Sequence, residues 1–165
     1  MSKVKIFLRF FNIFFIIILT GCAGQRYHKA VAPVTSAQAP LPVFAWPIEG
    51  GRRVGRFGGR EEGVTLKGVV LEGSEGQEVR SASDGNVVYA DESMRGYGRT
   101  LIVEHANGYS SVYARISDIF VSVGDRVRKG QPLARVGRGG KGSEPQVYFE
   151  VRQNSKPVDP ELVLR

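Results

Sequence analysis

Residues 144–152 read Glu144-Pro145-Gln146-Val147-Tyr148-Phe149-Glu150-Val151-Arg152. Apolar side chains recur at every second position, so that Val147, Phe149 and Val151 share one side of an extended chain. The other side carries Gln146, Tyr148 and Glu150. A period of two is typical of a β-strand that buries one face in a core. We therefore predict a strand over Val147–Arg152 whose second face borders a surface or a groove.

The chain upstream of this strand alternates between short apolar runs and glycine turns. Turn signals occur at Asp84-Gly85, Asn107-Gly108, Gly124-Asp125 and Lys129-Gly130. They separate further predicted strands at Gly63–Leu71, Glu78–Ser81, Gly85–Ala90, Thr100–His105, Ser110–Ala114, Arg126–Arg128 and Pro132–Val136. Helical periodicity is not sustained after residue 45, and at most Ile116–Ile119 is expected to form a single helical turn. Many short strands at regular spacing predict one all-β barrel or sandwich over residues 43–165.

The first 21 residues have the composition of an export signal. Lys3, Lys5 and Arg9 give a basic start, and residues 10–19 form an almost unbroken apolar run that is short for a transmembrane helix. Leu19-Thr20-Gly21-Cys22 follows and resembles a bacterial lipobox. That resemblance implies cleavage before Cys22 and attachment of a diacylglyceryl group to its sulfur, as in palmitoylated lipoproteins, which would anchor the protein to a membrane.

Residues 22–42 are rich in Ala, Pro, Ser and Gln and show no periodicity, so we predict a tether between the lipid and the domain. By analogy with lipoprotein sorting in enteric bacteria, Ala23 rather than Asp after the cysteine implies the outer membrane, with the domain facing the periplasm. Cys22 is the only cysteine in the sequence, which excludes an intramolecular disulfide.

The net charge of +7 is concentrated before the domain. Five basic residues and no acidic residue precede position 30, whereas residues 42–165 carry 18 basic and 16 acidic side chains. Nucleic-acid-binding domains have a strongly basic face, and so balanced a domain does not have the charge for one. We therefore predict no nucleic-acid partner.

Three blocks of the sequence, in the same order, resemble the LytM or lysostaphin-type zinc endopeptidases. They are residues 76–90, 96–105 and 123–134, and the resemblance extends from Trp46 to about Pro160. Residues 146–150 resemble the last strand of that family, which reads His-Leu-His-Phe-Glu. The resemblance implies a single β-sandwich or barrel-sandwich domain of short antiparallel strands, with long loops around a groove that cuts peptidoglycan.

The resemblance also implies a zinc ion held by three protein ligands, with a fourth position open for water. The family takes these ligands from a His-x-Gly-x-Asp strand and from the second histidine of His-x-His. Here Leu66, Val70 and Tyr148 stand at the ligand positions, and Arg115 and Gln146 stand where the family has catalytic histidines. We therefore expect no zinc, no other cofactor and no hydrolysis.

The replaced positions suggest a groove that binds a partner. Tyrosine and arginine are frequent at binding hot spots, and a guanidinium matches the geometry of a partner's carboxylate. The predicted partner-binding groove consists of Leu66, Val70, Tyr113, Arg115, Gln146 and Tyr148. The alternative is that these are ordinary surface side chains and that the groove has no function.

Two histidines remain, His28 in the tether and His105 at a strand end. We predict a packing or surface role for His105. A separate metal site made by Glu61, Glu62 and His105 is the alternative.

Degenerate LytM domains of the NlpD-like and EnvC-like types activate cell-wall amidases, and Asp91–Gly98 resembles the NlpD-like loop. The resemblance implies a non-catalytic envelope lipoprotein that binds and activates an N-acetylmuramoyl-L-alanine amidase during cell-wall remodelling or cell separation. The alternative is a lipoprotein that binds peptidoglycan or an envelope complex without activating an enzyme. Exposed aromatic residues would serve that binding, and the candidates are Tyr109, Tyr113 and Tyr148. A zinc endopeptidase with an unusual site is a third hypothesis.

Overall fold

The computed structural model describes residues 43–138 and 144–165, apart from the side chains of residues 92 and 93. All of them belong to one compact unit, Ala37–Arg165. The predicted export signal, Cys22 and the tether up to residue 42 lie outside the described residues. Within the described ranges, regular structure consists of strands and two short 3-10 turns, η1 (Ala106–Gly108) and η2 (Pro160–Leu162). The all-β prediction is confirmed. No helix among these residues is long and apolar enough to cross a membrane.

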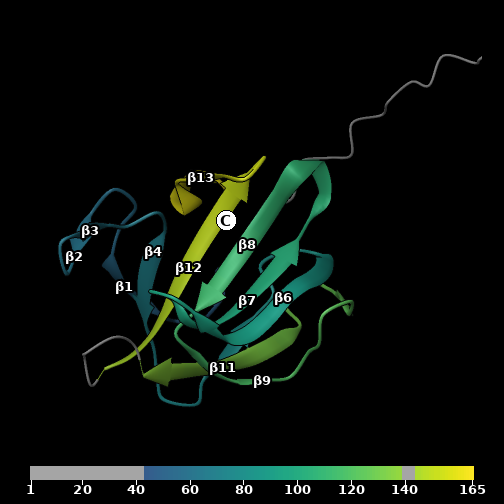
Figure 1. Cartoon of the computed structure of the whole chain (residues 1–165), viewed down its shortest axis with the longest axis horizontal. Helices are drawn as coiled ribbons and strands as arrows, with labels where there is room; N and C mark the ends of the chain where they lie inside the picture. The colour runs from purple at the N-terminus through teal and green to yellow at the C-terminus, as the bar shows by residue number, and fades with distance from the viewer. Residues whose placement is uncertain (1–42, 139–143) are drawn as a thin grey trace, which may run out of the picture. The chain divides into compact units, whose positions relative to one another are not determined.

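One highly curved antiparallel sheet makes up most of the domain (Figure 1). Its main path runs in the order β1-β4-β12-β8-β7-β6-β10. The bounds along that path are Arg52–Gly55 (β1), Val69–Glu72 (β4), Pro145–Gln153 (β12), Tyr109–Ala114 (β8), Gly98–Glu104 (β7), Gly85–Met94 (β6) and Arg126–Val127 (β10). The remaining strands of this sheet are Glu78–Arg80 (β5), Ile116–Ile119 (β9), Pro132–Arg138 (β11) and Lys156–Val158 (β13).

Strand β12 is the centre of this arrangement. It pairs with β4 on one edge and β8 on the other, while its two ends pair with β11 and β13. Strand β11 turns the sheet back on itself, because it also pairs with β5 and β9. The inner face of β12 therefore faces the core, and Val147, Phe149 and Val151 are fully buried there. The predicted strand and its core face are confirmed.

The core behind β12 combines aliphatic side chains with aromatic rings. Tyr113 of β8 packs against Phe149, with ring centroids 5.3 Å apart. The same cluster includes Val69 and Leu71 of β4, Leu101 and Val103 of β7, and Leu133 of β11. The ends of the domain meet beside it, because Phe44 forms an isolated parallel bridge with Leu164 and is itself fully buried.

The segment predicted as one strand over Gly63–Leu71 is in fact two. Residues 64–65 form β3 (Val64–Thr65), which pairs with β2 (Arg60–Glu61) in a separate two-stranded sheet. Glu62 and Gly63 join them with φ angles of 48° and 81°, as a tight hairpin turn requires. Leu66 then exchanges backbone hydrogen bonds with Gly58 and Gly59, and the chain joins the main sheet only from Val69.

The predicted helical turn at Ile116–Ile119 is wrong. These residues form β9, paired with Ala134 and Val136 of β11. Ile116 is buried in the core at the start of β9, whereas Asp118 is exposed, and the register of β9 and β11 shifts between Ala134 and Val136. Strands β1, β2 and β13 were not predicted, because their sequences are polar and have no apolar alternation.

Candidate functional site

A second apolar cluster lies on the outer face of the sheet, opposite the core. Tyr148 is directly paired with Val70 of β4 and with Ala114 of β8, so the three side chains form a row across neighbouring strands. Leu66, just after the hairpin, completes the cluster, and all four are buried. We call Leu66, Val70, Ala114 and Tyr148 the outer cluster.

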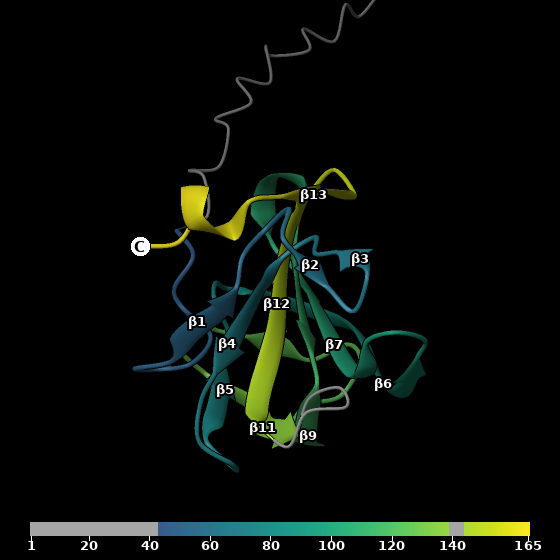
Figure 2. The same cartoon turned by 90° about the vertical axis from the view of Figure 1, so that its left-hand side faces the viewer.

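Two loops rise beside the outer cluster and form a groove above it. The β2–β3 hairpin and the turn between β6 and β7 lie on the same side of β12 (Figure 2). Between them is a cavity of about 400 Å³. Its floor includes Leu66 and Tyr148, and its walls carry five charged side chains: Glu61, Glu62, Lys67, Arg95 and Arg115. Of the six positions predicted from the sequence as a groove, Leu66, Arg115 and Tyr148 line this cavity.

Arg115 occupies a strained position at the edge of this groove. Its φ of 60° is in the left-handed region, which residues other than glycine adopt at a cost. The neighbouring backbone holds it there: its N–H donates to Tyr97 O at 3.2 Å, and its carbonyl accepts from Gly137 N at 3.1 Å. The guanidinium lies 5.8 Å above the Tyr148 ring centroid.

The Arg115 guanidinium already has a carboxylate partner within the chain. It donates to both Glu61 oxygens, with 3.0 Å between Nη1 and Oε1 and a second short bond from Nη2 to Oε2. The Arg115 side chain is 16% exposed to solvent, and the Glu61 side chain is 34% exposed. Such two-point pairing is the strongest geometry available to an arginine and a carboxylate. The sequence suggested a partner's carboxylate for Arg115, and the structure shows an internal one.

A buried carboxylate holds the floor of the groove together. Glu150 is fully buried, contrary to the prediction that it faces a surface or groove. It accepts hydrogen bonds from the hydroxyl of Tyr148 at 3.0 Å, from the hydroxyl of Tyr97 at 3.2 Å and from Nε of Arg152 at 2.5 Å. These three side chains cover the carboxylate and supply the donors that a buried charge needs.

Tyr97 links the β6–β7 turn to this floor. Its ring meets that of Tyr148 edge to face, with centroids 5.4 Å apart. Burial, followed by repulsion from Glu150, raises the pKa of both tyrosine hydroxyls above the ordinary value. Both therefore stay protonated at neutral pH and remain donors to Glu150.

Two of the predicted groove residues lie elsewhere. Tyr113 is fully buried in the core, where its hydroxyl accepts from Ala82 N at 2.8 Å and from Ser111 Oγ at 3.0 Å. It cannot contact a partner, because neighbouring positions of a strand point to opposite faces and Ala114, not Tyr113, faces the groove. Gln146 is half-buried at the start of β12, opposite Glu72 and Gly137, away from the side chains that line the cavity.

The outer cluster does not fit the zinc ion that the family resemblance implies. Leu66 and Val70 are aliphatic and offer no donor atom, and the Tyr148 hydroxyl is turned toward Glu150. In residues 43–138 and 144–165, no three His, Cys, Asp or Glu side chains lie close enough together to hold a metal ion.

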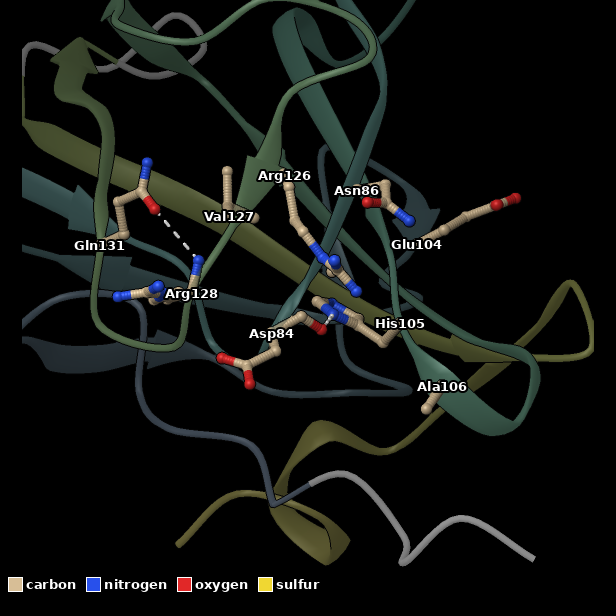
Figure 3. Close-up of a pocket in the computed structure, with 10 residues that line it drawn as sticks. Asp84, Asn86, Glu104, His105, Ala106, Arg126, Val127, Arg128 and Gln131 are labelled. Atoms are coloured by element: carbon tan, nitrogen blue, oxygen red, sulfur yellow. Dashed lines mark hydrogen bonds between the residues drawn. The ribbon is translucent and has the colours of Figure 1, made fainter.

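His105 lies at a separate cavity of about 880 Å³, shown in Figure 3. Its Nδ1 is 2.7 Å from Asp84 O and its Nε2 is 2.7 Å from Ser111 Oγ. The ring also meets Phe44 edge to face, with centroids 5.2 Å apart. Glu61 and Glu62 line the other cavity, so the alternative metal site of Glu61, Glu62 and His105 is not assembled. The packing role predicted for His105 agrees with these contacts.

The environment of His105 leads to a prediction about pH. Burial lowers its pKa below the ordinary value, although its bond to Asp84 O partly opposes this. The unfolded chain then binds a proton more readily than the folded one, so stability is lost as pH falls through about 6.5. We expect the free energy of unfolding, measured with urea between pH 8 and pH 5, to decline less steeply in His105→Gln than in the wild type. Equal slopes would contradict this assignment.

The tyrosines proposed as exposed aromatics are not exposed. Tyr109, Tyr113 and Tyr148 are all buried. The exposed large aromatics among the described residues are Trp46 and Phe120, at 41% and 47% exposure. Trp46 lines a further cavity of about 470 Å³ together with Glu49, Arg53 and Arg80.

Sequence reasoning missed Glu61, Tyr97 and Glu150 as members of the site. For Glu150 a signal existed, since Tyr148, Glu150 and Arg152 alternate and must share one strand face. No local pattern links Glu61 to Arg115 or Tyr97 to Glu150, because the two partners lie 54 and 53 positions apart in the sequence.

Comparisons with known proteins agree with the family resemblance seen in the sequence. Residues 64–160 match the family described as Peptidase family M23. The murein hydrolase activator EnvC of Escherichia coli is 40% identical over 124 residues, which cover 74% of this chain and 29% of that protein. The lipoprotein NlpD/LppB homolog of Pseudomonas aeruginosa is 39% identical over 132 residues, or 80% of this chain and 43% of the relative.

Among solved structures, a zinc-containing peptidase from Vibrio cholerae has a TM-score of 0.63 and 26% identity over 71% of this chain and 39% of its own. The chain thus spans less than half the length of each of these three proteins.

Proposed function

This chain belongs to peptidase family M23, and we propose that it is a non-catalytic member, an envelope lipoprotein that binds a cell-wall amidase and activates it. The target is an N-acetylmuramoyl-L-alanine amidase acting in cell-wall remodelling or cell separation. The partner binds at the groove above the outer cluster. Arg115 and Tyr97 contact it from the walls, and Leu66, Val70 and Tyr148 shape the floor.

The observation that carries this proposal is the apolar filling of the site. Leu66, Val70, Ala114 and Tyr148 pack together where the family resemblance implies metal ligands. Hydrolysis of this type needs a metal-bound water, but Leu66, Val70 and Ala114 offer no donor atom and the Tyr148 hydroxyl is bonded to Glu150. The fold and the groove nevertheless remain, with a buried ion pair network beneath the floor. A groove that is present but has no catalytic site is suited to binding a partner.

The relatives support activation as the purpose of that binding. One of them is named a murein hydrolase activator. An activator can shift its target only by the difference between its affinities for the target's active and inactive states. The groove would therefore bind a segment of the amidase that is accessible in the active state and stabilise that state.

Anchoring to the membrane through Cys22 is part of the same proposal. The lipobox-like residues 19–22 and the tether of residues 22–42 support a lipid anchor, and one relative is itself named a lipoprotein. A flexible tether of this length has a typical span of roughly 25 Å. The domain would stay close to the membrane, and the composition around Cys22 favours the outer membrane.

The test mixes labelled peptidoglycan with an amidase from the same organism and with this protein, prepared without residues 1–21 and with Cys22→Ser. We expect release of label by the mixture well above that of the amidase alone, and none from this protein by itself. Release by this protein alone, abolished by a chelator, would overturn the non-catalytic assignment. Binding to purified sacculi with no effect on amidase rate would instead favour a non-activating peptidoglycan binder. The exposed Trp46 and its cavity are the observation in favour of that second candidate.

Groove variants test the location of the binding site. We expect Arg115→Gly to reduce amidase stimulation at least about tenfold, since hot-spot truncations cost more than about 1.4 kcal/mol of binding. Glycine also suits the left-handed backbone at this position, so the domain should stay folded by circular dichroism. Arg128→Gly, at the separate cavity beside His105, is the matched control and should stimulate normally. Normal stimulation by Arg115→Gly would place the site elsewhere.

A further inference from the structure

The β2–β3 hairpin, residues 58–65, is only lightly attached to the domain. Its two strands form their own sheet and pair with no strand of the main sheet. Val64 at its tip is 67% exposed, and the buried side chain nearest to the hairpin is Leu66 at its base. Elements with few buried apolar contacts open at low free-energy cost.

Glu61 provides the polar link from this hairpin to the groove. Its two carboxylate oxygens are bonded to the Arg115 guanidinium. No other side-chain hydrogen bond or ion pair joins residues 58–65 to the rest of the described chain. The Glu61–Arg115 ion pair therefore both occupies the guanidinium and links the hairpin to the groove.

The charges around the cavity show what Glu61 contributes there. Lys67, Arg95 and Arg115 line it, against Glu61 and Glu62. With Glu61 in place, cations exceed anions by one, and without it they would exceed them by two. Removing Glu62 would change the charge equally, but only Glu61 is bonded to Arg115, so only its removal also frees the guanidinium for an acidic segment.

We propose that Glu61 occupies the position that a carboxylate of the partner takes on Arg115. In the free protein the hairpin covers Arg115. When an acidic segment of the partner enters the groove, its carboxylate replaces Glu61 on the guanidinium and the hairpin moves away. This inference rests on the proposed function, because it assigns a chemical class, an acidic segment, to the partner that the groove binds.

The exchange has a clear energetic logic. One carboxylate replaces another on the same guanidinium, so the number of ion pairs stays the same. The exchange itself therefore adds little binding free energy. The internal pair competes with the partner, and affinity must come from the remaining contacts with the groove. What the exchange adds is selection: a segment without a carboxylate at this point cannot displace Glu61 without leaving Arg115 unpaired.

Two neighbouring glutamates allow a matched experiment. Glu61→Gln removes the internal competitor, whereas Glu62→Gln makes the same charge change one residue away, at a side chain without an ion pair to Arg115. We expect the amidase concentration for half-maximal binding to fall about three- to tenfold for Glu61→Gln and to change less than twofold for Glu62→Gln. Equal effects of both variants, or weaker binding by Glu61→Gln, would overturn the exchange.

A second probe separates this inference from the proposed function. Hexaglutamate, with hexaglutamine as the uncharged control, reports on the site without any amidase. We expect Glu61→Gln to bind hexaglutamate more tightly than the wild type and Glu62→Gln do, and Arg115→Gly to lose this binding. If these results hold while no amidase is stimulated, the proposed function fails and the carboxylate site stands. If Glu61→Gln binds hexaglutamate no better than Glu62→Gln, the inference fails whatever the amidase shows.

Discussion

Replacing Glu150 by alanine is expected to lower the free energy of unfolding by about 3–5 kcal/mol, the cost of breaking a buried ion pair by removing one partner. The fully buried carboxylate is the shared acceptor for Tyr97, Tyr148 and Arg152. Its loss leaves the Arg152 charge, the buried Tyr148 hydroxyl and the half-buried Tyr97 hydroxyl without their acceptor. Urea unfolding monitored by circular dichroism measures the change.

Two further variants separate charge from packing at this position. Glu150→Gln keeps the shape and one acceptor oxygen, so we expect a smaller loss of about 1–3 kcal/mol. Glu104→Ala removes an exposed carboxylate from β7 and should change stability by less than about 0.5 kcal/mol. A Glu150→Ala protein as stable as the Glu104→Ala protein would show that the network does not hold the groove floor.

Gly68→Ala is expected to destabilise the domain by about 3 kcal/mol, at the upper end of overpacking effects. A methyl group at this position would run into the carbonyl oxygen of Phe149 and lie 2.9 Å from Cα of Glu150. Both are backbone atoms of the central strand and cannot move aside as a flexible side chain could. Thermal and urea unfolding would both report the loss.

The neighbouring Lys67→Ala is the control for Gly68→Ala. Lys67 is exposed and its replacement adds no atom near β12, so stability should change by less than about 0.5 kcal/mol. If Gly68→Ala were equally harmless, the close approach of β4 and β12 would be looser than the structure shows. The groove floor would then have room for rearrangement, which would weaken the argument for a fixed binding surface.

The central strand could be predicted from sequence because its signal is local. Alternation over residues 147–151 assigns one face to the core, and those side chains are buried as expected. The replacement of metal-binding residue types at positions 66, 70 and 148 is likewise a property of the sequence. The structure adds that these three side chains meet.

Other predictions failed because distant parts of the chain decide them. Ile116–Ile119 is a strand, since β11 offers it hydrogen-bonding partners and a core to face. Tyr113 was predicted to line the groove, yet the pairing of β8 with β12 turns it into the core beside Phe149.

The sequence by itself thus determined the all-β class, the position of the central strand and the aliphatic residues at two of the three expected ligand positions, because each depends on residue type and spacing. Only the tertiary structure decided that Glu150 is buried and that Arg115 is paired with Glu61. Both results depend on loops folding over the outer face of the sheet, which brings together residues more than 50 positions apart. Charged side chains carry no local signal of the partner that such a loop will supply.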